Sequence, residues 1–239
     1  MGCFSSAYMM GPGEHLFEQA ASTQGVVGPF TVRPDGVKDD RQAAQYIGQV
    51  MGILRMVGTI PTGNALITAI RDAHRPVLIF PLEQIDGGND LAWTYPRQGL
   101  FAVAISFTPI FGQRLRKLLG YDESKVELAY TPQEVLVHEL VHAARAVTCN
   151  FARLGDDVEE ELAVMIANMF AVEINRPPVT NYEDAVIVTS DLSGFGRKYY
   201  KENFDMIEAF YQQNKTLAQQ LSYSKSAFNP LRLYIDENV

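Results

Sequence analysis

The five residues from His138 to His142 read His-Glu-Leu-Val-His, and they constrain this chain more than any other stretch of its sequence. On an α-helix, residues four positions apart lie on the same face, so both imidazoles can reach one metal ion. Glu139 can then act as a general base on water at that metal. The pattern is typical of zinc hydrolases, and it uses two of the only 4 histidines in the chain.

The residues before the motif predict that it lies on a helix. Thr131 is a good N-cap, Pro132 suits the first helical position, and Glu134 completes a capping box. The residues around and after the motif are mostly apolar, which predicts that this helix is buried. A competing interpretation is that both histidines are ordinary core residues and that Glu139 pairs with Arg145.

The rest of the chain predicts one α+β domain, residues 38–239, after a flexible leader, residues 1–37, that is rich in glycine, serine and proline. Three β-branched or aromatic runs predict a small, mostly antiparallel sheet that packs on the motif helix and on the acidic helix after it. The expected strands are residues 77–80, 91–95 and 100–107, with a loop at 86–90; the expected helices are residues 39–57, 63–73, 113–119, the motif helix, 156–175 and 198–221.

Zinc at a hydrolytic site takes three protein ligands, so the chain must supply a third. No histidine follows His142, which leaves the carboxylates of residues 156–161. If Asp157 caps the following helix, Glu160 points away from the apolar stripe and helps to cap the helix end, whereas Glu161 flanks the stripe. We therefore favour Glu161 as the metal ligand. Glu160 is the main alternative, and the other acidic residues of the segment stay open.

Three segments of the sequence together resemble a known family. They are the motif with the alanine after it, the Glu160-Glu161-Leu162 step, and residues 175–182, which read Asn-Arg-Pro-Pro-Val-Thr-Asn-Tyr. They resemble the zinc metallopeptidase effectors that Gram-negative pathogens inject through type III secretion. Residues 61–67 also look like a segment of that family. The Glu-Glu-Leu step is similar to that of clostridial neurotoxin light chains, in which the second glutamate binds zinc.

The resemblance spans about residues 60–185 and implies a zincin-like metallopeptidase domain with one Zn²⁺. It also implies endopeptidase activity on host cytosolic proteins. Within it, Tyr182 is our candidate donor to the oxyanion, with Arg232 and Tyr234 as alternatives. Val179 departs from the pattern, which would have an arginine there.

Two other functions fit the motif: a zinc hydrolase that acts on a non-protein substrate, and a binding module with a structural metal site. A structural zinc site takes four protein ligands, and the sequence shows no obvious fourth, which argues against the binding module. For a peptidase, we expect an extended protein or peptide substrate to add to a sheet edge within residues 91–107.

The first six residues fit the pattern for N-myristoylation at Gly2, with Cys3 beside it as a palmitoylation candidate. Two acyl chains would anchor the protein at the inner face of a host membrane, which suits an effector secreted by a non-classical route into the host cytosol. The alternative is a leader that matches the pattern by accident. The formal net charge is −8 and the sequence pI is about 5.0, so we expect no nucleic-acid partner.

Overall fold

The computed structural model describes residues 24–81, 92–96, 103–109, 130–151, 153–180, 187–188 and 191–239. Within these ranges the strands are β1 (Gly25–Val27), β2 (Phe30–Val32), β3 (Val77–Phe80), β4 (Ala92–Pro96) and β5 (Val103–Phe107). The helices are α1 (Asp40–Thr59), α2 (Pro61–Asp72), α4 (Pro132–Val147), α5 (Asp156–Glu173), α6 (Leu192–Glu202), α7 (Phe204–Gln213), α8 (Lys215–Ser222) and α9 (Pro230–Asn238). The chain is thus an α+β protein, as predicted. The expected loop 86–90 and helix 113–119 lie outside the described residues.

The described strands form one five-stranded sheet in the order β1-β2-β3-β5-β4. The β1–β2 and β4–β5 pairings are antiparallel. β3 runs parallel to both β2 and β5. The prediction of a mostly antiparallel sheet is therefore wrong, and the sheet is mixed. The parallel β2–β3 pairing arises because α1 and α2 form a crossover between these strands, which returns the chain to the same end of the sheet.

β1 and β2 belong to a segment that the sequence assigned to a flexible leader. Gly28 and Pro29 join these two strands, and Gly28 has a φ of 56°, a left-handed conformation that glycine adopts without strain. The glycine and proline here are hairpin turn residues rather than signs of a mobile leader. Because β2 pairs with β3, the domain boundary expected at residue 37 does not hold for residues 25–32.

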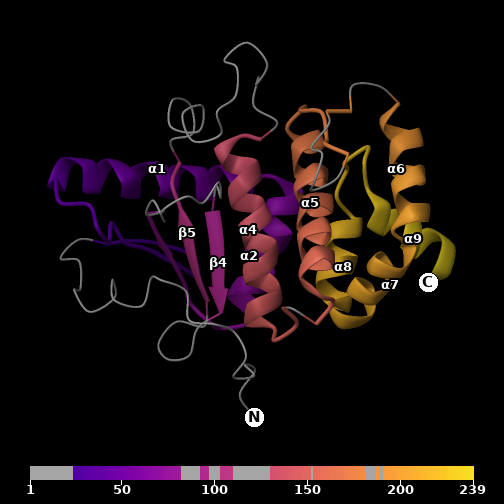
Figure 1. The fold of residues 1–239 in the computed structure, drawn as a ribbon, viewed down its shortest axis with the longest axis horizontal. Helices are drawn as coiled ribbons and strands as arrows, with labels where there is room; N and C mark the ends of the chain where they lie inside the picture. The colour runs from indigo at the N-terminus through magenta and orange to yellow at the C-terminus, as the bar shows by residue number, and fades with distance from the viewer. Residues whose placement is uncertain are drawn as a thin grey trace.

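α4 lies between the sheet and α5, and helices α6 to α9 gather on the far side of α5 (Figure 1). α4 contacts β4, β5, α2 and α5, while α5 also contacts α2 and α7. Because α5 has packed neighbours on both sides, every residue from Leu162 to Ala171 is buried. This arrangement places the motif helix in the middle of the molecule.

Residues 198–221, predicted as one helix, are divided among α6, α7 and α8. The breaks fall at Asn203 and Asn214. The side-chain amide of each asparagine donates a hydrogen bond to the carbonyl oxygen four residues earlier, at 3.1 Å to Tyr199 and 3.4 Å to Phe210. Asparagine side chains compete in this way with the main chain, and they therefore favour helix ends over helix interiors.

No single described helix has both the length and the apolar composition to cross a membrane. The pair α1 and α2 passes that test only when the two are taken together, and they are bent by 108° relative to each other. Both helices contribute side chains to the core, including Val50 and Leu54 of α1 and Leu66 and Ile70 of α2.

Candidate metal centre

The motif helix α4 is capped as its sequence predicts. The Thr131 hydroxyl accepts a hydrogen bond from the Glu134 amide at 3.3 Å, and the Glu134 carboxylate accepts one from the Thr131 amide. Pro132 occupies the first turn. The capping box places the motif inside α4, and because His138 and His142 are four residues apart they lie one turn apart on the same face. Their Nε2 atoms are 3.1 Å apart.

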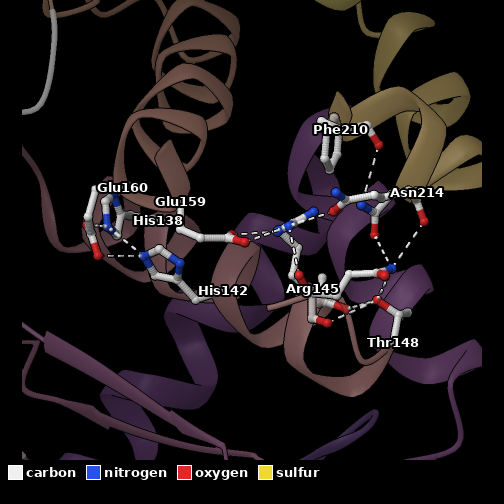
Figure 2. A network of polar contacts seen from close by, with 11 residues as sticks. His138, His142, Arg145, Thr148, Glu159, Glu160, Phe210 and Asn214 are labelled. Carbon is white, nitrogen blue, oxygen red and sulfur yellow. Dashed lines mark hydrogen bonds and ion pairs between the residues drawn. The ribbon is translucent and has the colours of Figure 1, made fainter. Parts of the chain in front are cut away.

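The third donor beside the two imidazoles is the Glu160 carboxylate, in the first turns of α5 (Figure 2). Its Oε2 lies 3.0 Å from His138 Nε2, and its Oε1 lies 3.4 Å from His142 Nε2. We call these three residues the His–Glu cluster. Among the described residues they form the one group of histidine, cysteine and acidic side chains whose ligand atoms converge, all within 4.8 Å of one another.

The spacing of these atoms suits a tetrahedral metal ion. Zinc binds nitrogen and oxygen at about 2.0–2.2 Å, so two ligand atoms of a tetrahedral site lie about 3.3 Å apart. In the His–Glu cluster the two nitrogens are 3.1 Å apart, and the two oxygens of Glu160 lie 3.0 Å from His138 Nε2 and 3.4 Å from His142 Nε2. Two imidazoles and one carboxylate are also donor types that hold metals at hydrolytic sites. The cluster therefore fits a metal ion bound by three protein side chains.

The charges in the cluster favour an ionised carboxylate that faces the imidazoles. Burial raises the pKa of the Glu160 carboxyl, but hydrogen bonds with the two histidines and their charge outweigh burial and bring that pKa well below its usual value. Burial lowers the pKa of the His142 imidazole, while the hydrogen bond to Glu160 and the nearby carboxylates raise it above its usual value. Protons and a metal ion therefore compete for the same donor atoms.

The Glu139 carboxylate accepts a hydrogen bond from a residue of the sheet. Thr94, on β4, donates its hydroxyl proton to Glu139 Oε2 at 2.6 Å, and the same hydroxyl lies 3.2 Å from the main-chain oxygen of Glu139. The Glu139 side chain is buried beneath this contact. The interpretation that pairs Glu139 with Arg145 is wrong, because Arg145 forms its ion pair with Glu159.

Glu161, the residue that the sequence favoured as the third ligand, has a different partner. Its Oε1 accepts a 2.6 Å hydrogen bond from the Tyr199 hydroxyl on α6. The prediction took Asp157 as the cap of α5, whereas the cap is Gly155, so the helix begins earlier than assumed. It also took one apolar stripe as the buried side. Because α5 is enclosed on both sides, Glu160 can point away from that stripe and still face α4.

A second polar pair between α4 and α5 was not predicted from the sequence. The guanidinium of Arg145 is completely buried and binds the Glu159 carboxylate at 2.5 and 2.6 Å (Figure 2). The signal for this pair was an arginine within an apolar helix, since a buried arginine needs a carboxylate partner. The sequence contained several carboxylates that could serve, and only the packing of the two helices selects Glu159.

Of the predicted oxyanion donors, Tyr182 lies outside the described residues and stays a prediction. Arg232 donates hydrogen bonds to two main-chain carbonyl oxygens at and just after the end of α8. The Tyr234 ring packs against two aromatic rings of α7. Both alternatives to Tyr182 are therefore engaged among the C-terminal helices.

Comparisons of the chain with protein-family models, with curated proteins and with solved structures gave no match. The family resemblance of the sequence therefore stays a prediction. The geometry of the His–Glu cluster and of Glu139 is the structural feature that points to a function.

Proposed function

We propose that this protein is a zinc-dependent endopeptidase whose metal ligands are His138, His142 and Glu160. The observation that supports the proposal is the convergence of two imidazole nitrogens, 3.1 Å apart, on the carboxylate of Glu160, whose two oxygens lie 3.0 and 3.4 Å from them. The carboxylate of Glu139 belongs to the residue next to His138. Zinc held by these donors would act as a Lewis acid and would lower the pKa of a bound water to about 7. All three ligands come from two helices packed side by side in the core, which is a rigid support for such a site.

Glu139 is the proposed general base. Thr94 donates to its Oε2, so Oε1 is the oxygen that takes a proton from the attacking water and later gives it to the leaving amine. The Thr94 hydrogen bond keeps the carboxylate in one orientation, and burial keeps other water away from it. Tyr182 remains our proposed donor to the oxyanion, as the sequence resemblance implies.

The proposed substrate is an extended polypeptide that adds to β4. This strand pairs with β5 alone among the described strands, and it contacts α4. An edge strand leaves main-chain N–H and C=O groups available to a peptide. Of the two described strands in the expected binding region 91–107, β4 is the one with a free edge, because β5 is paired on both sides.

A non-protein substrate is the main alternative, since the cluster determines the water-activating centre and not what is hydrolysed. The structural-metal alternative is weaker. A structural zinc site is closed by four protein ligands, and the cluster holds three donors among the described residues.

The decisive experiment pairs metal analysis with the Glu139→Gln variant. The wild type should contain one zinc per chain and hydrolyse members of a peptide library. The variant should keep its zinc and lose activity by about 10²–10⁴-fold, the usual contribution of a general base. A zinc-free wild type, or a variant with full activity, would refute the proposal. Hydrolysis of esters or other amides, with no peptide cleaved, would favour the non-protein alternative.

The setting of this activity is a separate proposal, which depends on the sequence alone. We propose that the chain is an effector that acts on host cytosolic proteins and is anchored to the host membrane through acylated Gly2 and Cys3. In host cells, Gly2→Ala should move the protein from the membrane fraction to the soluble fraction and leave zinc content unchanged. An unchanged distribution would contradict acylation without affecting the proposed chemistry.

A further inference from the structure

The buried ion pair between Arg145 and Glu159 lies beside the His–Glu cluster, to its right in Figure 2. The side chains are 0% and 2% exposed, so the pair is fully enclosed. Arg145 Nε binds one oxygen of Glu159 at 2.5 Å, and Nη2 binds the other at 2.6 Å. Two parallel hydrogen bonds define both the distance and the angle between the two groups.

Each partner of this pair is next to a proposed metal ligand. Arg145 follows His142 by one turn of α4, and Glu159 immediately precedes Glu160 on α5. α4 and α5 run in opposite directions, so the pair joins the end of α4 to the start of α5. A shift of one helix along the other would therefore break the ion pair and move Glu160 away from the imidazoles together.

The pair is also joined to the C-terminal helices. Arg145 Nη2 donates to the Asn150 carbonyl oxygen at 2.8 Å and to Gln213 Oε1 on α7 at 3.1 Å. The Asn150 amide donates in turn to Gln213 and Asn214. The Phe210 ring lies 5.8 Å from the guanidinium carbon. Four segments of the chain thus meet at one arginine, which restricts how α4, α5 and α7 can move relative to one another.

A buried ion pair is a poor way to gain stability, because removing two charges from water offsets much of their attraction. Apolar residues of similar size often serve a core as well or better. What an ion pair with fixed hydrogen bonds adds is a defined geometry. Between two helices that carry the donors of one cluster, that geometry bears directly on the distances among those donors.

We propose that Arg145 and Glu159 are positioning residues that hold Glu160 at metal-binding distance from His138 and His142. This inference rests on the proposed metal site, and it extends that site to a pair of residues that touches neither metal nor substrate. It predicts that the pair is required for tight metal binding even where it is not required for folding.

The test is the double variant Arg145→Met/Glu159→Leu, which removes both charges and keeps side chains of similar volume. Zinc affinity is measured by competition with a chelator, and folding by thermal unfolding. The double variant should fold and bind zinc about 10–100-fold more weakly than the wild type, as expected when groups that orient ligands are lost. An unchanged zinc affinity in a folded double variant would overturn the proposal.

The control is a second ion pair, which joins the start of α4 to the segment just after α5. Arg176, which follows the end of α5, binds Glu134 at 3.0 Å in the first turn of α4. In the double variant Glu134→Gln/Arg176→Met, glutamine can keep the capping box. Zinc affinity should stay within about twofold of the wild type, because this pair does not involve the start of α5, where Glu160 lies. An equal loss in both double variants would mean a general loosening of the helices and would refute the positioning role.

Two further measurements keep the inference separate from the proposed function. Nitrogen-edited NMR of the metal-free protein reports whether the two imidazoles contact a carboxylate. The resonances of His138 and His142 should change in the Arg145→Met/Glu159→Leu variant and not in the control. If the wild type binds no zinc, the proposed function fails, and unchanged resonances would then refute the positioning role as well.

If the double variant does not fold, Arg145→Lys replaces it, since lysine keeps the charge but cannot form the two parallel bonds. About tenfold weaker zinc binding by this variant would support the proposal. Wild-type affinity would overturn it.

Discussion

Glu159 and Glu160 are neighbours on α5 and both face α4, yet they lie in different surroundings. The Glu159 side chain is 2% exposed and has a permanent cation, the guanidinium of Arg145. The Glu160 side chain is 34% exposed and faces two imidazoles, which are charged only when protonated. The Arg145–Glu159 pair is electrically complete within the protein. The His–Glu cluster is complete only with protons or a metal ion in it.

The difference shows that direction around the helix, rather than residue type, decides what each carboxylate does. Successive helix residues point about 100° apart, so three consecutive glutamates reach three different neighbours. Glu159 reaches Arg145, Glu160 reaches the imidazoles, and Glu161 reaches Tyr199 on α6. The Arg145–Glu159 pair can therefore define the spacing of the helices while the adjacent Glu160 carboxylate is available to bind a metal ion.

The largest expected effect comes from removing one partner of the Arg145–Glu159 ion pair. Arg145→Met alone leaves the Glu159 charge buried without its cation, which should cost about 3–5 kcal/mol of unfolding free energy. Urea unfolding measures this loss. Lys198→Met is the control, since the Lys198–Glu202 pair is exposed and should contribute about 0.5 kcal/mol or less. If Arg145→Met lowers the unfolding free energy by less than about 1 kcal/mol, the description of this pair as buried and electrically complete would be contradicted.

The second prediction separates the two carboxylates that the sequence could not separate. Glu160→Gln should weaken zinc binding by about 100-fold or more, because it removes a ligand charge from the cluster. Glu161→Gln should change zinc affinity by less than about threefold, because glutamine still accepts the Tyr199 hydrogen bond. Chelator competition measures both. Comparable losses would mean that Glu161 also contributes to the site.

A smaller effect is expected where the sheet meets the motif helix. Thr94→Val removes the hydroxyl that holds Glu139 Oε2 and keeps a side chain of similar shape. The turnover number should fall by about tenfold with zinc content unchanged, since the change affects only the orientation of the base. Thr94→Ser restores a donor and should recover most of the activity. Full activity of the valine variant would remove Thr94 from the mechanism.

The smallest effect is a pH dependence of the metal-free protein. The lowered pKa of Glu160 stabilises the fold above the carboxyl's ordinary value of 4.5, and this contribution is lost as pH falls below it. The raised pKa of His142 stabilises the fold below the imidazole's ordinary value of 6.5, and this contribution is lost as pH rises above it. Both stabilising contributions are fully present only between pH 4.5 and pH 6.5.

Thermal unfolding across pH should therefore show a gain within this window, on the order of a few degrees. The gain should be absent from Glu160→Gln and should disappear when zinc replaces the protons. A gain that persists in Glu160→Gln would assign it to other groups.

The sequence predicted the features that depend on neighbouring residues. Thr131, Pro132 and Glu134 predicted the start of α4, and the spacing of the two histidines predicted that they share a face. Both depend on hydrogen bonds and turns within a few residues, so the sequence contains the information they require. The start of α5 was predicted less well, because Gly155 caps it without any side-chain hydrogen bond.

Features that join distant segments were not predictable in the same way. The hairpin at residues 25–32 consists of two three-residue strands, which become recognisable only because β3 pairs with β2. The parallel pairings of β3 depend on crossovers, and a run of apolar residues does not specify the direction of its neighbour.

By itself, then, the sequence determined that two imidazoles and a glutamate share one buried helix and that an acidic helix start follows. The tertiary structure alone decided which glutamate completes the cluster and which one pairs with Arg145. The reason is that α5 is packed on both sides, so a single apolar stripe no longer tells which of its faces meets α4. That choice depends on how two helices lie against each other, and the Arg145–Glu159 pair is one of the contacts between them.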